Sequence, residues 1–131
     1  MFLRTKNNLT PIFRHAYIVD MAELLGTFEQ IVLLAVLGLD DDAYGRAVLH
    51  DVQQAFHGGR SISAGAVYAT LDRLEVKGLL CSRLEKGTPS RGGRVRRFYR
   101  LTPAGASALT EARNTLERLW HGKPWPLEVI S

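Results

Sequence analysis

Lysine and arginine are concentrated in one stretch of this chain, and that concentration favours binding to a polyanion. From Tyr44 to Leu101 the sequence holds eleven Lys or Arg and four Asp or Glu, a net charge of +7. The rest of the chain carries six basic and nine acidic residues, a net charge of −3. Positive charge gathered on one segment attracts phosphate groups more strongly than the same charge spread evenly. The alternative is a basic, solvated face that binds nothing.

Six of these cations lie between Lys86 and Arg100, a stretch with no acid. Expected strands at Leu79–Glu85 and Val95–Leu101 flank a loop rich in Gly and Arg, which predicts a β-hairpin. Side chains alternate along a strand. The second strand should therefore show Arg94, Arg96, Phe98 and Arg100 on one face and Val95, Arg97, Tyr99 and Leu101 on the other. Val95, Tyr99 and Leu101 are expected to pack inward, and Arg94, Arg96 and Arg100 to face solvent or DNA. The guanidinium groups of such a hairpin suit a nucleic-acid backbone, although sheet edges also carry cations only for solubility.

The segment before the hairpin predicts a helix that begins at Ser63 and stops at Gly78. Ser63 is a good N-cap, and Val67, Leu71 and Leu74 share the inward face. A helix followed directly by a basic hairpin is the layout of a winged helix-turn-helix, in which the helix enters the major groove and the wing lies on the backbone. Tyr68 could instead be a core aromatic. The candidate DNA contacts are Ser63, Tyr68, Arg73 and Lys77 on the helix and Arg91, Arg94, Arg96 and Arg97 on the wing.

Two further helices are expected before this unit. The first should begin with a capping box, Thr27–Gln30, continue through an almost wholly apolar run at 31–37, and end at Gly38. The second should run from about Ala43 to His57, capped by the carboxylates of Asp40–Asp42 and closed by the glycines at 58–59. Gly45 in its first turn suggests a close backbone contact. A short strand at 61–62 could add a third member to the sheet.

The last expected helix starts at the cap-and-proline pair Thr102–Pro103 and ends near His121. It is too long and exposed for a monomer, and the helix before Gly38 is apolar almost all round, so both suggest a homodimer. The side chains expected at the dimer contact are Leu109, Leu116, Leu119 and Trp120. Two copies of the groove-reading helix would then match a palindromic operator. Trp120 could also form a wall for a small aromatic effector, though simple packing is the stronger interpretation.

The predicted fold class is mainly α with a small β-hairpin, a winged helix-turn-helix with an additional C-terminal dimerisation helix. We expect an N-terminal arm or short helix at 1–22, the DNA-binding domain at 23–102, the dimerisation helix at 103–122 and an irregular tail at 123–131. A length of 131 residues favours one domain.

Several other classes of protein are not supported. No nucleophile, phosphate-loop or metalloprotease motif is present, and the four histidines have no partners at metal-ligand spacing, so we expect no enzyme, metal or cofactor. The single cysteine, Cys81, is expected to be a buried small hydrophobe, with a redox-sensing thiol as the alternative. No apolar run is long enough to span a membrane and the start lacks a signal peptide, so a cytoplasmic protein is expected.

The chain from about residue 24 to 119 resembles the PadR-type transcriptional regulators. The matching pieces are L-L-G-T-F-E-Q-I-V-L-L-A-V-L (24–37), A-Y-G (43–45), S-A-G-A-V-Y-A-T-L-D-R-L-E-V-K-G-L (63–79) and R-G-G-R-V-R-R-F-Y-R-L-T-P-A-G (91–105). The resemblance implies a dimeric DNA-binding repressor, often relieved by a small molecule. It also implies that Tyr68 and the wing arginines lie on DNA, and that the C-terminal helix makes the dimer with help from the first helix. The chain departs from the family in its first 20 residues and in its single short C-terminal helix. The competing hypothesis is a winged-helix interaction module whose basic face binds an acidic protein partner.

Overall fold

A computed structural model describes residues 25–56 and 61–126, except for the side chain of Arg91. Four α-helices and a two-stranded hairpin make up this part of the chain. In order they are α2 (Thr27–Leu39), the 3-10 helix η1 (Asp40–Asp42), α3 (Gly45–Ala55), α4 (Ala64–Val76), β2 (Leu80–Glu85), the 3-10 helix η2 (Pro89–Arg91), β3 (Arg96–Leu101) and α5 (Pro103–Trp120). This confirms the expected mainly helical fold with a small hairpin. The expected arm at 1–22, His57, the glycines at 58–59 and the end of the tail lie outside the described residues.

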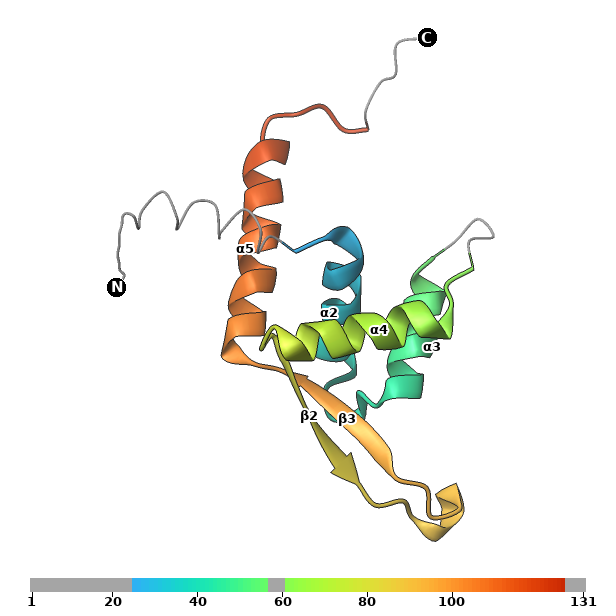
Figure 1. Ribbon diagram of the computed structural model, residues 1–131. Coiled ribbons are helices and arrows are strands. Elements are labelled where there is room, and N and C mark those ends of the chain that lie inside the picture. Colours follow the sequence, from blue (N-terminus) through green and yellow to red (C-terminus); the bar gives the residue numbers. More distant parts are fainter. Residues whose placement is uncertain (1–24, 57–60, 127–131) are drawn as a thin grey trace, which may run out of the picture.

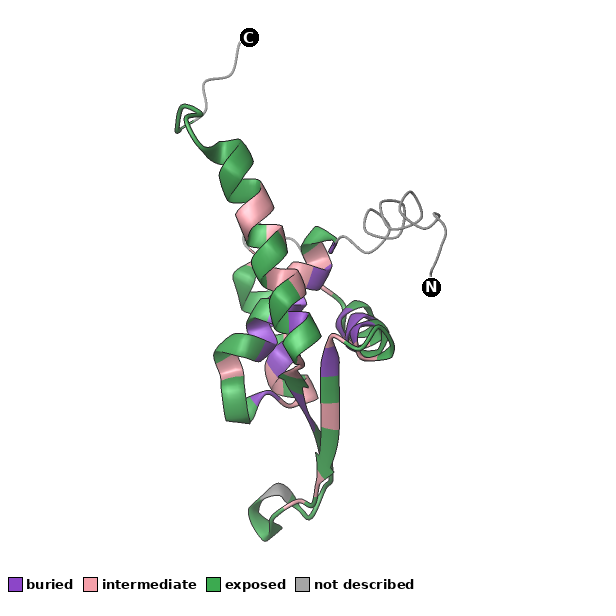
Figure 2. Ribbon diagram, turned by 90° about the vertical axis from the view of Figure 1, so that its left-hand side faces the viewer, coloured by how far each residue is buried: buried purple, intermediate pink, exposed green. Residues whose placement is uncertain are grey.

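The core lies where α2, α3 and α4 meet the base of the hairpin. Figure 1 shows the hairpin projecting from this bundle at one end and α5 extending in the opposite direction, and Figure 2 shows buried positions gathered between them. The expected inward face of α4 is confirmed, because Val67, Leu71 and Leu74 are wholly buried. They pack with Leu33 of α2 and Val48 of α3 in one cluster. Each fully buried aliphatic side chain contributes roughly 1.5–3 kcal/mol of hydrophobic stabilisation.

The start and end of α2 differ from the sequence prediction. Its N-cap is Gly26 and not Thr27, because the Glu29 carboxylate reaches back to accept the Gly26 N–H at 3.1 Å. Gln30 donates instead to the Leu25 carbonyl at 3.2 Å. The helix also continues past Gly38 to Leu39, and the chain turns at Asp40, which has a φ of +51°.

The start of α3 also differs. Asp40–Asp42 form η1, and the N-cap of α3 is Tyr44, without a side-chain capping bond. The acidic triplet therefore turns the chain and does not cap the helix. The close contact expected at Gly45 is confirmed, since a Cβ there would lie 3.1 Å from Cε1 of Tyr68. Gly45 thus gives the Tyr68 ring room against the first turn of α3.

The hairpin pairs β2 with β3 in an antiparallel register that runs from Leu80 opposite Leu101 to Glu85 opposite Arg96. No strand forms at 61–62. The position beside β3 is taken by the turn before α3, where Tyr44 bridges to Phe98 and the Tyr99 N–H donates to the Ala43 carbonyl at 2.9 Å. A turn close to β3 in space displaces the segment that follows α3 in the chain.

The alternation along the hairpin is only partly as expected. Tyr99 faces the core, but Phe98 on the supposed outward face is also buried, because Tyr44 packs on it. Val95 was expected inside and is 59% exposed, because it precedes the paired part of β3. Cys81 is exposed and not buried, because Leu80 takes the inward position beside it. The interpretation of Cys81 as a buried hydrophobe is therefore wrong.

Helix α5 is joined to the bundle through its first turn, as the cap-and-proline pair predicts. The Thr102 hydroxyl accepts the Gly105 N–H at 3.0 Å and donates to the Gly78 carbonyl at 2.6 Å. Gly78 itself ends α4 at a φ of +78°, which favours glycine. Gly105 is buried against the backbone of Leu79, and a Cβ there would overlap the Leu79 carbonyl oxygen.

Two glycine substitutions should therefore have opposite effects on stability. Gly105→Ala forces the first turn of α5 away from a backbone that cannot yield, and should lower the free energy of unfolding by roughly 1–3 kcal/mol. Gly38→Ala lies in α2 with no atom within 4 Å of the added Cβ, and should raise it by about 0.5–1 kcal/mol. Urea unfolding of both variants and the wild type checks this. Equal stability of Gly105→Ala and the wild type would contradict the close packing.

Candidate nucleic-acid interface

The N-terminal turn of α4 is exposed and built from small residues. The Ser63 hydroxyl caps the helix, accepting the Ala66 N–H at 3.1 Å, as predicted. Ala64, Gly65 and Ala66 are all exposed. Small side chains let a helix end approach another surface closely, but they offer few groups that read base edges. Tyr68, one turn further on, is half-buried against Gly45, so it is only partly a core aromatic, and its contact with DNA stays a prediction.

The two cations at the other end of α4 pair with a single carboxylate of α2. Lys77 Nζ lies 2.8 Å from Glu29 Oε2, and Arg73 Nε lies 3.5 Å from the same oxygen. Glu29 belongs to α2 and is only 8% exposed. This ion-pair cluster ties α4 to the start of α2. The proposed phosphate contacts of Arg73 and Lys77 stay predictions, and in this structure both side chains already have an acidic partner.

Glu29 is charged over a wide pH range. Burial raises the pKa of its carboxyl, but hydrogen bonds from Lys77 and the Gly26 N–H, the charge of Lys77 and a hydrogen bond from Arg73 outweigh it. The net pKa lies below the ordinary value of 4.5. A carboxyl whose pKa is lowered by folding adds stability above its unfolded pKa and loses that contribution as the pH falls through its folded pKa.

The arginines of the wing differ in their exposure and in the groups that they contact. Arg94 is exposed. The Arg96 guanidinium lies over the Tyr44 ring, 3.9 Å from its centroid. Arg97 donates to the Ser82 hydroxyl at 2.9 Å, and Ser82 donates in turn to Glu75 of α4 at 2.7 Å. Hydrogen bonds through Ser82 therefore connect the wing to α4. The side chain of Arg91 lies outside the described part of the structure.

The tip of the wing turns tightly at two glycines. Gly92 and Gly93 have φ values of +71° and +75°, a conformation that favours glycine. Their N–H groups donate to the carbonyls of Pro89 and Thr88 at 3.0 and 2.9 Å. The tip is therefore closed by hydrogen bonds of its own backbone.

A hollow of about 370 Å³ lies between the wing and the helices, bordered by α3, Tyr68 of α4 and the start of β3. It brings together four of the predicted site residues, Tyr68, Arg94, Arg96 and Arg97. Ser63, Arg73 and Lys77 are not among its lining residues. Two lining residues, Tyr44 and Arg46, were missed as site residues by sequence reasoning. The A-Y-G tripeptide was the available signal, but it is distant in the chain from the wing that it contacts.

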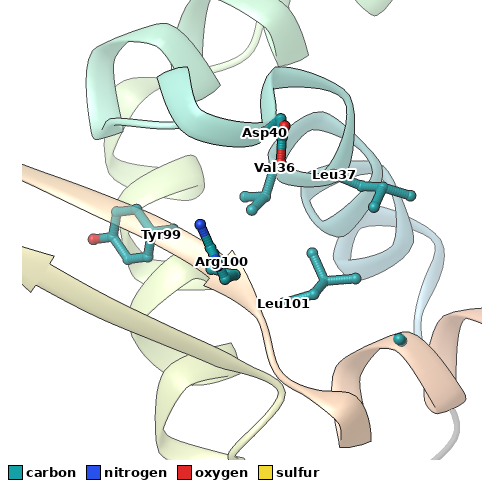
Figure 3. A pocket seen from close by; sticks show the side chains of 7 residues that line it. Val36, Leu37, Asp40, Tyr99, Arg100 and Leu101 are labelled. Carbon is teal, nitrogen blue, oxygen red and sulfur yellow. The ribbon is translucent and has the colours of Figure 1, made fainter.

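A second hollow, of about 330 Å³, lies at the other end of β3 (Figure 3). Val36, Leu37 and Asp40 from the end of α2 face Tyr99, Arg100 and Leu101 of β3 across it. Its arginine is already paired, because Arg100 Nη2 lies 3.3 Å from Asp41 Oδ1. The lining thus mixes apolar side chains with the Asp40 carboxylate and an arginine that is already paired, and it offers no strong site for an anion.

The expected dimer residues on α5 separate into two groups. Leu109 is partly buried against the core of its own chain. Leu116, Leu119 and Trp120 are 49%, 63% and 46% exposed on the outer half of the helix, which Figure 2 shows mostly as exposed. Leu34 and Leu37 of α2 are also more than half exposed. Within residues 25–56 and 61–126 no helix combines the length and apolarity of a membrane span, and no three potential ligands gather for a metal ion.

Comparisons with known proteins agree with this geometry. Residues 33–111 match the transcriptional regulator PadR-like family. The transcriptional regulator Rv3488 of Mycobacterium tuberculosis is 45% identical over 80 residues, which cover 61% of this chain and 68% of that protein. A PadR family transcriptional regulator from Eggerthella lenta superposes with a TM-score of 0.55 and 28% identity, covering 82% of this chain and 92% of the other. One from Clostridium difficile gives 0.54 and 27%, covering 70% and 88%.

The ion-pair cluster around Glu29 leads to a pH-dependent prediction. Glu29→Gln should lower the free energy of unfolding by about 1–2 kcal/mol near neutral pH, because charged hydrogen bonds are removed at a largely buried site. The difference from the wild type should shrink as the pH falls below 4.5, where the wild-type carboxylate itself takes up a proton. Urea unfolding across this pH range measures both. Glu111→Gln, at an exposed pair on α5, is the control and should change little. A gap that stays constant with pH would rule out the assigned role of the Glu29 charge.

Proposed function

The chain belongs to the PadR-like family of transcriptional regulators, and on that premise we propose that it binds double-stranded DNA as a homodimer and represses transcription. The observation that carries the proposal is the basic hollow between Tyr68 and the wing. Arg94, Arg96 and Arg97 line it beside the exposed start of α4. In a winged helix-turn-helix, a helix in the major groove and a wing on the adjacent backbone would place such a hollow over phosphates. Repression, and not activation, is the expectation that the family resemblance carries.

The chemistry of this face favours affinity over base reading. Its charged groups are guanidinium groups, which pair with phosphate in a planar, two-pronged geometry. The first turn of α4 offers only Ser63 as a polar side chain, and its hydroxyl already caps the helix. Specificity should therefore depend on close approach of the helix and on the shape of the DNA as much as on direct base contacts. No catalytic role is proposed.

The first functional prediction concerns the wing. Arg94→Ala combined with Arg96→Ala should weaken binding to all duplexes alike, because phosphate contacts carry no sequence information. The slope of log affinity against log salt should become shallower by about 0.9 for each phosphate that the variant no longer neutralises. Fluorescence anisotropy with duplexes selected from genomic DNA, and with an unrelated duplex, measures both quantities.

A matched control removes the same charge elsewhere. Arg113→Ala combined with Arg118→Ala lies on α5, where both arginines pair with glutamates of the same helix. This variant should keep the salt slope of the wild type. If the wild type binds no duplex at any salt concentration but is captured by an acidic protein, the interaction-module hypothesis replaces the proposal.

The proposal of a homodimer rests on apolar surface that the described chain leaves uncovered. Leu116, Leu119 and Trp120 lie on the outer half of α5, beyond its contacts with the bundle. An isologous contact between two such helices would cover these side chains and place two α4 helices on one face, which would read a palindrome. Leu109 packs on its own core in part and would lie at the edge of such a contact.

Leu116→Asp should therefore convert a dimer to a monomer at micromolar concentration, because it places a charge in an apolar contact. Sedimentation velocity measures the change, and DNA affinity should fall with it, since a monomer reads one half-site. Val76→Asp is the control, because Val76 is 88% exposed at the end of α4. A wild type that sediments as a monomer would overturn the dimer.

A small aromatic effector remains a weaker proposal. The Trp120 ring is already met edge-on by Trp125, with centroids 5.4 Å apart and planes at 85°. This contact supports the interpretation of Trp120 as a packing residue. A hollow at the same end of α5 is lined by polar residues, Asn114, Glu117, Arg118 and His121, and not by Trp120. The effector contact at Trp120 stays a prediction.

A further inference from the structure

Two arginines and two aromatic rings are stacked along one face of the wing. The Arg96 guanidinium lies 3.9 Å from the centroid of the Tyr44 ring. Tyr44 and Phe98 are tilted neighbours, with centroids 5.6 Å apart. The Arg83 guanidinium lies 5.0 Å from the Phe98 centroid on the hairpin. An arginine over an aromatic face is attracted by the ring's quadrupole. The order along the stack is therefore Arg96, Tyr44, Phe98 and Arg83.

The Tyr44 ring is held in place by its backbone. Tyr44 bridges to Phe98, and the preceding carbonyl of Ala43 accepts the Tyr99 N–H at 2.9 Å. On its other side, the Tyr44 carbonyl accepts the Val48 N–H at 2.9 Å in the first turn of α3. The ring is thus fixed at the junction of α3 and β3. A long, flexible arginine that lies on a fixed ring has fewer orientations to lose when it binds an anion.

The same ring borders the basic hollow together with four arginines, Arg46, Arg94, Arg96 and Arg97. Arg97 already donates to the Ser82 hydroxyl, which leaves the guanidinium groups of Arg46, Arg94 and Arg96. None of the three has a carboxylate within salt-bridge distance among the described residues. Glu85 stands opposite Arg96 in the hairpin register, but its carboxylate is bound by Arg83 at 2.7 Å. Glu85 is therefore paired with Arg83, and no carboxylate of the described residues neutralises the positive charge of the hollow.

Gly45, between Tyr44 and Arg46, connects the hollow to the recognition helix. Tyr68 packs closely on Gly45, and a Cβ at this position would lie 3.1 Å from Cε1 of its ring, so a side chain there would push the ring outward. Tyr44 thus contacts the wing, and Gly45 contacts α4. Arg46 supplies a cation to the hollow. This gives the A-Y-G tripeptide and its following arginine a physical role that the family resemblance did not supply.

We propose that the hollow holds one backbone phosphate of DNA, bound by Arg46, Arg94 and Arg96, and that Tyr44 is the positioning residue that aims Arg96 at it. The inference rests on the proposed function, because it names the part of the DNA that this site takes. Arg46 enters as a binding residue outside the helix and the wing. Tyr44 acts through Arg96 and contributes no charge.

A double-mutant cycle tests the positioning role. Arg96→Ala and Tyr44→Leu should each weaken binding to a selected duplex about three- to tenfold, and the double variant should be no weaker than Arg96→Ala alone. Tyr44→Phe keeps the aromatic face and should stay within about twofold of the wild type. The control cycle pairs Tyr44→Leu with Arg113→Ala on α5, where the effects should simply add. Effects of Tyr44→Leu and Arg96→Ala that add fully would overturn the role of Tyr44.

Arg46→Ala tests the proposed phosphate-binding site, called here the phosphate seat, without changing the stacked residues Arg96, Tyr44, Phe98 and Arg83. Arg46 is exposed, so its removal should leave thermal stability unchanged. Binding should weaken about three- to tenfold, and the log–log salt slope should become shallower by about 0.9, because one phosphate is no longer neutralised. A decrease in stability alone would not change that slope. Arg46→Ala with the affinity and slope of the wild type would overturn the seat, even if Tyr44→Leu failed to fold.

The outcomes separate this inference from the proposed function. A wild type that binds no duplex rejects both. A wild type that binds duplexes with a steep salt dependence, but with Arg46→Ala unchanged, keeps the proposed function and rejects the phosphate seat.

Discussion

The wing is anchored by two consecutive aromatic residues of β3 that lie on opposite faces of the hairpin. Phe98 and Tyr99 are 7% and 6% exposed, although a two-stranded sheet has no third strand to cover it. Tyr99 is covered by the helical core, and Phe98 by Tyr44 and the Arg83 side chain. An isolated hairpin is at best marginally stable in water, so burial on both faces is what lets this one project from the bundle. The geometry of the basic hollow depends on that anchor.

Charge is distributed so that some cations are held by the protein and others are left for a partner. Arg73 and Lys77 pair with the largely buried Glu29, and Arg100 pairs with Asp41. Arg46, Arg94 and Arg96 line the hollow with no carboxylate in salt-bridge range in the described part of the chain. The first group joins α4 to α2 and the wing to η1. The second group leaves the hollow with positive charge that carboxylates of the described chain do not neutralise. Net charge alone does not distinguish the two groups.

The core and the element order were predictable because they depend on local periodicity and on start and stop residues. Ser63 caps α4, Gly78 ends it, and Thr102 with Pro103 starts α5, each within about a turn of the expected position. The predicted helix boundaries were wrong where a different residue caps the helix. The Glu29 side chain moved the cap of α2 to Gly26, and Tyr44, not the acidic triplet, caps α3. Cys81 and Val95 were misassigned because the burial of a hairpin residue depends on what lies over it.

Local sequence was enough to predict the winged-helix layout, the inward face of α4, the basic wing and the family resemblance, because hydrophobic period, caps and charge density are properties of neighbouring residues. Which cations lack an acidic partner depends instead on contacts that form when the chain folds. Folding placed Glu29 of α2 beside Arg73 and Lys77 of α4, a pairing 48 residues apart in the case of Lys77. It also placed the Tyr44 ring under Arg96. Ion pairs and cation–π contacts act over a few ångströms, and sequence spacing says little about which distant side chains the fold brings that close.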